Sequence, residues 1–321
     1  MRLGLLSTAR INGEILAAAA DSERVEVVAV ASRDAARATE YAREHGIPRA
    51  HGSYAALVED GEVDAVYVSL PNSLHHEWTL HALQAGKHVL CEKPYSRSPA
   101  EVEEAFDTAD AAGLVLMEAF MYRHHPQTHA IEQHVRDGTL GRLLAVRSTF
   151  TFPLASLADI RAQPDLAGGA LMDVGSYCVS GSRLLAGEPT TVLAEQVTGP
   201  TGIDIAFFGT MRFPGDVVGQ FEASFIAPQR QSLEVVGEDG VMVAHAPWRT
   251  DWAGEVRILR DGGEEIITVP TANAYSLELE NFADAVAGTA QPLLGREDAL
   301  GQTRTIAALY SAAAEGRSVA L

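Results

Sequence analysis

AGKHVLCEKP (residues 85–94) decides the fold of this 321-residue chain. Residues 88–91 form a short apolar run, which suits a strand that is buried on both faces of a sheet. Pro94 favours extended geometry at Lys93 and lacks a backbone N–H, so the chain turns out of the sheet there. We therefore expect Lys93 at the carboxyl end of a buried parallel strand, where open α/β sheets bind ligands. An isolated Lys-Pro pair is more simply explained as a surface lysine after a strand. The neighbouring sequence therefore has to decide whether Lys93 has a function.

The first third of the chain alternates strand-like and helix-like segments. This alternation predicts crossover helices and a doubly wound parallel sheet, the Rossmann type of α/β fold. Strands are expected at residues 2–7, 25–32, 64–70, 88–91 and 114–117, and helices at 11–21, 34–45, 74–85 and 99–112. We expect residues 1–118 to form a nucleotide-binding domain.

The pattern changes after residue 118, where short segments alternate polar and apolar residues. EDG at residues 238–240 and DGG at 261–263 are typical of hairpin turns between such segments. Residues 119–321 should form a substrate-binding α+β domain with a large, mostly antiparallel sheet. Such a sheet can leave one face uncovered, so we expect a homodimer or homotetramer through it. Strands are expected at residues 143–152, 191–197, 203–213, 217–225, 232–236, 256–259 and 265–269, and helices near 276–287 and 296–315.

The turn after the first strand, GLLSTARING at residues 4–13, is the candidate phosphate-binding loop. It has Ser7 and Ala9 where the usual dinucleotide fingerprint has glycines. A helix N-terminus still offers backbone amides to a pyrophosphate, and the hydroxyls of Ser7 or Thr8 could add hydrogen bonds. An ordinary strand–helix turn capped by Ser7 or Thr8 is the alternative. The candidate cofactor-binding residues in this loop are Ser7, Thr8, Ala9, Arg10 and Ile11.

The end of the second expected strand indicates which cofactor is bound. A dinucleotide-binding unit that grips a ribose 2′-hydroxyl has an acid there, about 20 residues past the glycines. This chain has Ser32 and Arg33 at that place, and a hydroxyl with a guanidinium suits a 2′-phosphate. The pair favours NADP over NAD. Asp34 could instead be the ribose-binding acid displaced by one residue, or it could begin the next helix.

Four motifs together carry a resemblance to a known family. They are AGKHV and EKP within residues 85–94, SLPN at 69–72 with His75, GGALMDVGSY at 168–177, and MEAFMYR at 117–123. With these motifs the chain resembles the Gfo/Idh/MocA family of nicotinamide-dependent oxidoreductases over nearly its whole length. STARI at residues 7–11 departs from the usual family glycines and resembles a variant of the dihydrodiol dehydrogenase and xylose dehydrogenase branch.

The resemblance implies a catalytic set of Lys93, Asp173 and Tyr177. Asp173 and Tyr177 are four residues apart, so a helix would present both on one face, although an amphipathic helix with a half-buried tyrosine has the same spacing. Family chemistry is hydride exchange between nicotinamide and a carbon that bears a hydroxyl. We expect Tyr177 to carry the proton and Lys93 to favour the phenolate or serve as the alternative acid. Asp173 would orient the substrate hydroxyl or tune the lysine, and Tyr177 and Lys93 can titrate as a coupled pair.

The resemblance also implies contacts to the cofactor and the substrate. Tyr122 and Arg123 are expected near the substrate. The simpler alternatives are a proline turn before a polar helix start at residues 71–75, and surface ion pairs at Arg123 and Arg161. The residues expected beside the ribose and nicotinamide are Leu70, Pro71, Asn72, His75, Glu92, Lys93 and Arg161.

Composition excludes several classes of protein. The chain has 24 Lys and Arg against 43 Asp and Glu, a net charge of −19, and no basic stripe that could neutralise nucleic-acid phosphates. No apolar run approaches the roughly 18 residues of a membrane span, and no secretory signal is recognisable. We therefore expect a cytoplasmic protein that acts on a small molecule. Cys91 and Cys178 are too few for a disulfide framework, and we expect both to be reduced and buried.

Clustered histidines raise the question of a metal site. His125 and His129 are one helical turn apart, and His124 is adjacent. The glutamate of the His-Glu-x-x-His pattern is missing, and no third ligand is spaced to complete a site. We expect a solvated helix face there and no metal.

Three functions fit these observations to different degrees. An NADP-dependent oxidoreductase acting on CH–OH groups of a sugar, polyol or cyclic diol is favoured by Lys93, Asp173 and Tyr177 together. A non-catalytic NAD(P)-sensing regulator of the same fold would be expected to lose that set. A redox-assisted NAD-dependent glycosidase would keep its cofactor bound, and Arg33 argues against it because an exchangeable NADP suits a stand-alone dehydrogenase.

Overall fold

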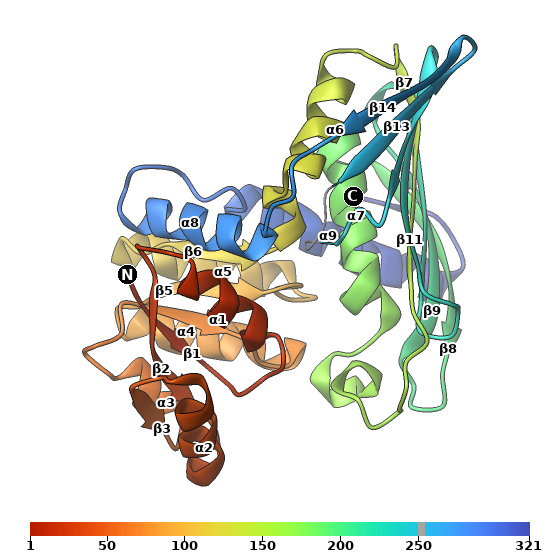
Figure 1. Ribbon diagram of the computed structural model, residues 1–321. Coiled ribbons are helices and arrows are strands. Elements are labelled where there is room, and N and C mark those ends of the chain that lie inside the picture. The colour runs from red at the N-terminus through yellow and green to blue at the C-terminus, as the bar shows by residue number, and fades with distance from the viewer. Residues whose placement is uncertain (250–253) are drawn as a thin grey trace. The chain divides into compact units, whose positions relative to one another are not determined.

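The chain folds into two compact units, each with its own sheet (Figure 1). The computed structural model describes residues 1–249 and 254–321. The first unit comprises residues 1–121 and 273–300, and the second comprises 122–272 and 301–321. These bounds differ from the predicted 1–118 and 119–321, because helix α8 (Ala274–Val286) returns to pack against α1 (Asn12–Ala20) of the first unit.

The first unit is built on a six-stranded parallel sheet with the order β3-β2-β1-β4-β5-β6. This order confirms the predicted doubly wound Rossmann sheet, and it reverses between β1 and β4, so the loops after these strands meet at the carboxyl edge. The strands are β1 (Arg2–Leu5), β2 (Glu26–Ala31), β3 (Arg49–His51), β4 (Ala65–Val68), β5 (His88–Glu92) and β6 (Leu116–Ala119). The other helices are α2 (Ala35–His45), α3 (Tyr54–Val58), α4 (His75–Gln84), α5 (Pro99–Ala112) and the start of α9 (Arg296–Glu315).

The two faces of this sheet are covered by different helices. Val66 and Val68 of β4 and Cys91 of β5 belong to a core that they share with α3, α4 and α5. Because side chains alternate along a strand, Tyr67 and Glu92 point to the opposite face. Right-handed crossovers put α1 on that opposite face, since β1 to β2 and β4 to β5 step in opposite directions across the sheet. Helix α8 packs beside α1 and therefore covers the same face (Figure 1).

Two short elements of the first unit are absent from the sequence prediction. Strand β3 has three residues and helix α3 has five, which is too short to show a hydrophobic period. A local hydrogen bond marks the start of α3, where the Ser53 hydroxyl accepts from the Ala56 amide at 3.1 Å. Elements of this size are defined by capping and by strand pairing more than by hydrophobic pattern.

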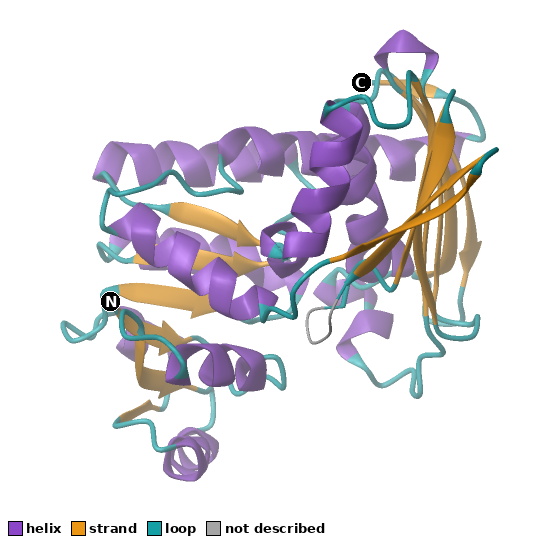
Figure 2. Cartoon of the chain, turned by 45° about the horizontal axis from the view of Figure 1, so that its top comes forward, coloured by secondary structure: helices purple, strands orange, loops and turns teal. Residues whose placement is uncertain are grey.

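The second unit is built on a sheet that has nine strands within the described residues, in the order β14-β13-β12-β11-β7-β10-β9-β8-β15. Neighbouring strands are antiparallel except for β7 and β10, which confirms the prediction of a mostly antiparallel sheet (Figure 2). The strands are β7 (Leu143–Thr151), β8 (Thr191–Thr198), β9 (Asp204–Arg212), β10 (Val218–Ser224), β11 (Arg230–Gly237), β12 (Gly240–His245), β13 (Glu255–Arg260), β14 (Gly263–Thr268) and β15 (Val319–Ala320).

Both predicted hairpins are present in this sheet. Gly237 pairs with Gly240 across the first turn, and Arg260 pairs with Gly263 across the second. Helix α7 (Ser176–Ala186) packs against β7 and β10, and α6 (Pro126–Arg136) contacts β13. Of the helices that the structure describes, none is long and apolar enough to cross a membrane.

The buried residue Asp60 connects β3 with the segments that precede β4 and β5. Arg49 Nε and His51 Nε2 lie 2.6 Å and 2.9 Å from Asp60 Oδ2, and the Glu62 amide donates to Oδ1 at 2.9 Å. Lys87 Nζ donates to the Asp60 carbonyl at 2.8 Å. Burial alone would raise the pKa of Asp60, but the hydrogen bonds from Arg49, the Glu62 amide and His51 outweigh burial and lower the pKa to about 2. The charged form of Asp60 is therefore the form that stabilises the fold.

Asp60→Asn should lower the free energy of unfolding near neutral pH by about 2 kcal/mol, the equivalent of a pKa shift of this size. A carboxylate with a lowered pKa contributes stability above about pH 4, and the contribution disappears as the pH falls toward about 2. Urea unfolding of the wild type and the variant across this pH range measures both effects. The exposed Asp165→Asn should change neither, and a stability difference that persists undiminished at about pH 2 would contradict the assignment.

Candidate active site

Lys93 directly follows β5, whose last residue, Glu92, fixes the lysine backbone. Glu92 Oε2 accepts a hydrogen bond from the Lys93 amide at 3.2 Å, and Oε1 accepts one from the Tyr67 hydroxyl. Burial, and then the charge of Glu92, raise the pKa of Tyr67, so this phenol stays protonated and acts as a donor. The Lys93–Pro94 peptide bond is cis. The predicted position of Lys93 at the carboxyl edge of the sheet is thus held by side chains of two adjacent strands.

His75 connects the loops that follow β4 and β5. Its ring is fully buried, and its nitrogens lie 3.0 Å and 2.8 Å from the carbonyl oxygens of Pro94 and Leu70. Burial lowers the pKa of His75, so the neutral ring donates to one of these carbonyls at a time. Leu70 is itself buried, while Pro71 and Asn72 are half-buried at the start of a short 3₁₀ turn. Of the residues predicted here, His75 acts on the backbone, and Pro71 and Asn72 remain accessible.

Ser7 joins the loop after β1 to the loop after β4. Its Oγ lies 3.0 Å from the Ser69 carbonyl and 2.8 Å from the Ser69 hydroxyl, and it accepts from the Ala9 amide at 3.0 Å. The Ser7 hydroxyl is therefore engaged inside the protein. In the part of the chain that the structure describes, the amides of Arg10 and Ile11 are among those that have no acceptor, so the loop can offer these N–H groups to an anion. Thr8, Ala9 and Ile11 are half-buried, and Arg10 is exposed.

The end of β2 separates the roles of three neighbouring residues. Ser32 is buried, and its hydroxyl accepts from the Asp34 amide at 3.2 Å. Asp34 caps α2, since its Oδ1 accepts from the amides of Ala36 and Arg37 at 2.9 Å and 3.2 Å. Of its two sequence interpretations, the structure supports the start of the next helix. Arg33 between them is exposed and reaches a pocket.

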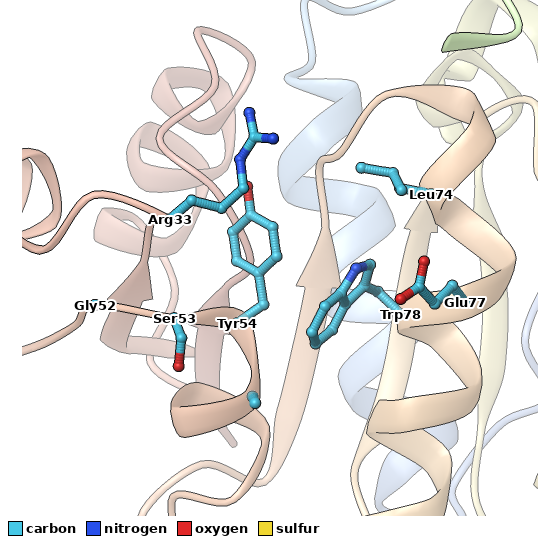
Figure 3. A pocket seen from close by; sticks show the side chains of 8 residues that line it. Arg33, Gly52, Ser53, Tyr54, Leu74, Glu77 and Trp78 are labelled. Atoms are coloured by element: carbon cyan, nitrogen blue, oxygen red, sulfur yellow. The ribbon is translucent and has the colours of Figure 1, made fainter. Parts of the chain in front are cut away.

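This pocket has a volume of about 410 Å³ and an aromatic wall (Figure 3). The rings of Tyr54 and Trp78 meet edge to face, with centroids 5.1 Å apart and an angle of 79° between their planes. Figure 3 shows the Arg33 side chain extending past the Tyr54 ring, with Trp78 facing that ring from α4. A guanidinium beside an aromatic wall suits a flat ring that carries an anionic group. The residues that line the pocket are Arg33, Gly52, Ser53, Tyr54, Ala55, Leu74, Glu77 and Trp78.

Asp173 and Tyr177 lie at the junction of two kinds of helix in the second unit. Asp173 belongs to a π-helical turn, Leu171–Gly175, and Tyr177 belongs to the first turn of α7. The sequence predicts one regular helix here, and the π turn departs from it. A π turn is wider than an α-helical turn and keeps residues four or five apart on the same face, which is compatible with the predicted shared face of Asp173 and Tyr177. Turns of this kind are frequent at functional sites.

The paired glycines before this turn are required by close packing. A Cβ at Gly168 would lie 2.4 Å from the Arg161 carbonyl oxygen, and one at Gly169 would lie 2.2 Å from Asp204 Oδ1. Gly169 also has a φ of +134°, which side chains rarely tolerate. Asp204 in turn accepts from the Leu171 amide at 2.7 Å and so fixes the start of the π turn. The paired glycines of the GGALMDVGSY motif are therefore explained by close packing within the second unit.

Arg161 holds the carboxylate of Asp173. Its Nε donates to Asp173 Oδ2 at 2.8 Å, and its Nη1 lies 3.3 Å from Asp159 Oδ1. The charge of Asp173, followed by that of Asp159, raises the pKa of Arg161 against the effect of burial. Arg161 is a predicted cofactor contact, and the structure shows it engaged with the predicted catalytic aspartate. This charge-assisted hydrogen bond orients the Asp173 carboxylate.

Tyr177 is surrounded by aromatic rings of its own unit. Its ring centroid lies 5.7 Å from that of Tyr122, 5.4 Å from that of Phe150 and 5.9 Å from that of Trp248. Tyr122 is almost completely buried and donates its hydroxyl to Ser180 Oγ at 2.7 Å. Arg123 is likewise buried. The structure thus makes Tyr122 a packing partner of Tyr177, and its expected position near the substrate stays a prediction.

The remaining candidate groups are inert or buried. Cys91 and Cys178 are unpaired and buried, and burial raises the pKa of both thiols, that of Cys178 to about 12. His124 and His125 are buried, so the expected solvated helix face is wrong for them, and burial lowers the pKa of His124 to about 3. Across residues 1–249 and 254–321, no group of three or more His, Cys, Asp or Glu side chains could hold a metal ion.

In each of the two units, the sequence motifs miss some of the residues that the structure places beside the candidate groups. Tyr54 and Trp78 of the pocket wall and Asp204 of the π turn were not predicted as site residues. Trp78 follows the SLPN motif on α4, and an aromatic residue so near a predicted ligand loop was the available signal. Asp204 offered none, because it lies 33 positions from its partner Leu171.

Comparison with protein families gives two matches that cover most of the chain. Residues 2–120 match the Gfo/Idh/MocA model described as an oxidoreductase family with an NAD-binding Rossmann fold. Residues 128–243 match the Gfo/Idh/MocA C-terminal domain.

Three similar proteins have names or solved structures. The chain is 41% identical to D-xylose 1-dehydrogenase (NADP(+)) 2 of Haloferax volcanii, over 100% of both chains. It is 36% identical to human trans-1,2-dihydrobenzene-1,2-diol dehydrogenase, over 75% of this chain and 73% of that protein. The crystal structure of KijD10, a 3-ketoreductase from Actinomadura kijaniata in complex with NADP and TDP-benzene, superposes with a TM-score of 0.93 at 31% identity over 97% of each chain.

Proposed function

The chain belongs to the Gfo/Idh/MocA family of oxidoreductases, and from this premise we propose that it is an NADP-dependent dehydrogenase or reductase. The reaction moves a hydride between nicotinamide and a carbon that bears a secondary alcohol or a ketone. The substrate class is a sugar, a polyol or a cyclic diol, which agrees with the names of the xylose and dihydrobenzenediol dehydrogenases.

One observation carries the proposal, namely the position of Lys93 at the carboxyl end of β5. The Glu92 carboxylate holds the lysine backbone, and His75 ties the adjoining Pro94 carbonyl toward the loop after β4. Ligands of doubly wound sheets bind at this edge, next to the point where the strand order reverses. An ionisable amine at that place is suited to chemistry on a bound ligand.

The proton of the substrate hydroxyl needs a side chain to receive it during oxidation. We assign this role to Tyr177, with the Lys93 ammonium stabilising the phenolate, or to Lys93 itself. Asp173 orients the hydroxyl and is held in place by Arg161. The bound nicotinamide would accept or supply the hydride.

The first unit has suitable groups for the 2′-phosphate and pyrophosphate of NADP. Arg33 lines the aromatic pocket and has no carboxylate partner among residues 1–249 and 254–321, so its charge can meet a phosphate. Tyr54 and Trp78 offer flat surfaces for the adenine. The amides of Arg10 and Ile11 offer donors for the pyrophosphate. We therefore propose NADP as the cofactor, in agreement with the NADP named for the Haloferax enzyme and KijD10.

A homo-oligomer through the second sheet is also part of the proposal. Helix α7 covers one face of this sheet, while Leu193, Val197 and Phe208 on the other face are 46%, 45% and 44% exposed. A second copy of the chain would bury these apolar side chains. The two unpaired, buried cysteines are compatible with the reducing cytoplasm that the sequence suggested.

Lys93→Ala and Tyr177→Phe should each lower kcat by at least about 100-fold, because each removes a group that handles the transferred proton. The NADP dissociation constant, measured by fluorescence titration, should change little. Lys93→Arg keeps the charge but cannot release a proton under these conditions, so it separates the electrostatic role from the acid role. Tyr41→Phe on α2 is the control for loss of a phenol.

The assay pairs NADP and NAD with a panel of sugars, anhydro sugars, inositols and dihydrodiols, and follows nicotinamide absorbance. Wild-type rates in both Lys93→Ala and Tyr177→Phe would overturn the catalytic assignment. Turnover with a bound cofactor but without net absorbance change would indicate the glycosidase. Cofactor binding without turnover on any substrate would indicate the regulator.

Arg33→Ala should weaken NADP binding by roughly tenfold to a hundredfold and leave NAD binding within about twofold, since a charge-assisted phosphate contact contributes about 1.5–3 kcal/mol. Isothermal titration of both cofactors measures the change. Arg43→Ala, an exposed arginine in the last turn of α2, controls for the loss of one positive charge. Equal weakening of NADP and NAD would refute the 2′-phosphate contact.

Phe208→Arg should convert the oligomer into single chains of 34.2 kDa, because a buried, unpaired charge at the interface is unfavourable. Light scattering after size-exclusion chromatography measures the mass. Leu277→Arg makes the same exchange at an exposed leucine of α8, in the first unit, and should leave the mass unchanged. A wild type that is already a single chain, or a Phe208→Arg variant of unchanged mass, would contradict this interface.

A further inference from the structure

Glu278 is a buried carboxyl group to which the proposed reaction assigns no role. It lies on α8, one turn after Tyr275, and its side chain has no solvent exposure. Among the residues that the structure describes, no N–H or O–H group donates a hydrogen bond to either of its carboxyl oxygens. Buried polar groups are nearly always hydrogen-bonded, so this carboxyl requires an explanation.

The geometry of the first unit directs Glu278 toward Glu92. Tyr67 and Glu92 point to the face of the sheet that α1 and α8 cover, as strand alternation shows. Tyr275 and Glu278 belong to the buried side of α8. The titratable groups around Glu278 are thus Glu92 from β5, Tyr67 from β4, Tyr275 from α8 and the exposed Glu14 of α1, with Lys93 adjoining Glu92.

Two carboxylates cannot both remain charged in such a region. A buried, unpaired charge is costly, and two like charges near each other disfavour the ionisation of one of them. Glu92 receives hydrogen bonds from the Tyr67 hydroxyl and the Lys93 amide, which stabilise its charged form. Glu278 receives none from residues 1–249 and 254–321, so burial, and then the charge of Glu92, raise the pKa of Glu278 well above its usual range. The proton therefore belongs on Glu278.

We propose that Glu278 is a neutral carboxylic acid that donates a hydrogen bond to Glu92, and that this pair positions Lys93 through the hydrogen bond that the Lys93 amide donates to Glu92. The pair holds one proton and makes no contact with the reacting carbon. Glu278 is a positioning residue, and only its effect on turnover rests on the proposed function. A carboxylate with about four acceptor sites can take this third donor beside Tyr67 and Lys93.

Infrared difference spectroscopy tests the protonation near neutral pH. The spectrum of the wild type minus that of Glu278→Gln should contain the carbonyl band of a protonated carboxylic acid. Glu280→Gln is the matched control on the same helix, because Glu280 pairs with Arg24 at 3.2 Å and is about one-third exposed. Its difference spectrum should contain carboxylate bands only. Carboxylate bands alone in the Glu278→Gln difference would overturn the proposal.

The positioning of Lys93 is tested by NMR of lysine-labelled protein. The chain contains only two lysines, Lys87 and Lys93, so the spectrum is simple and Lys93→Ala assigns it. Glu278→Leu removes the donor and should shift the Lys93 signal, whereas Glu278→Gln keeps an N–H donor and should restore it. In the assay, Glu278→Leu should lower kcat by about tenfold or more, with Glu278→Gln within about threefold of the wild type. An unshifted Lys93 signal in Glu278→Leu, or equal damage in both variants, would overturn the positioning role.

These tests remain separate from the test of the proposed function. The infrared and NMR measurements need no substrate, so they stand even if no substrate is turned over. Conversely, a Lys93→Ala variant that loses turnover, combined with a Glu278 that is ionised in the infrared spectrum, would retain the oxidoreductase and reject the shared proton.

Discussion

The structure depends on side chains that join the loop ends of adjacent parallel strands. Ladder hydrogen bonds fix the strands of the first sheet, but they stop where the strands end, and the backbone groups beyond need other partners. Ser7 bridges to Ser69, and the His75 ring lies between the carbonyls of Leu70 and Pro94. These buried contacts hold the loops after β1, β4 and β5 as one rigid edge. Glu92 then fixes the backbone of Lys93 at this edge.

Hydrophobic period predicts most of the fold because it records which side of a segment is buried. It predicts every strand of the Rossmann sheet except the short β3, and the Asp-Gly turns predict the hairpins of the second sheet. The same pattern does not identify the partner that covers a buried side. Helix α8 is amphipathic in either unit, and only the packing against α1 places it in the first. The domain boundary was therefore beyond what a local pattern could decide.

The candidate site shows the same division between local and long-range information. Lys93 and the Asp173–Tyr177 spacing are visible in the sequence because each motif lies within one short segment. The groups that hold them come from elsewhere, as Arg161 holds Asp173 and Asp204 fixes the turn that carries it. Close packing also involves residues from other segments of the chain. The Arg161 carbonyl and Asp204 leave no room for a side chain at positions 168 and 169, so both positions need glycine. Such contacts form only when the chain is folded, and no periodic pattern in the sequence indicates them.

The scarcity of lysine in this chain gives an independent argument about the proposed chemistry. Of 24 lysine and arginine residues, only Lys87 and Lys93 are lysines, although arginine can replace lysine at most exposed positions. Lys87 is buried, and its compact ammonium donates to the carbonyls of Asp60 and Val63, where a planar guanidinium would not fit the same two acceptors. The presence of a lysine, and not an arginine, at position 93 needs a different explanation. An amine can release a proton near neutral pH when its surroundings favour it, and a guanidinium cannot. A lysine at this one edge position agrees with the proton-handling or charge-tuning role that we propose for it.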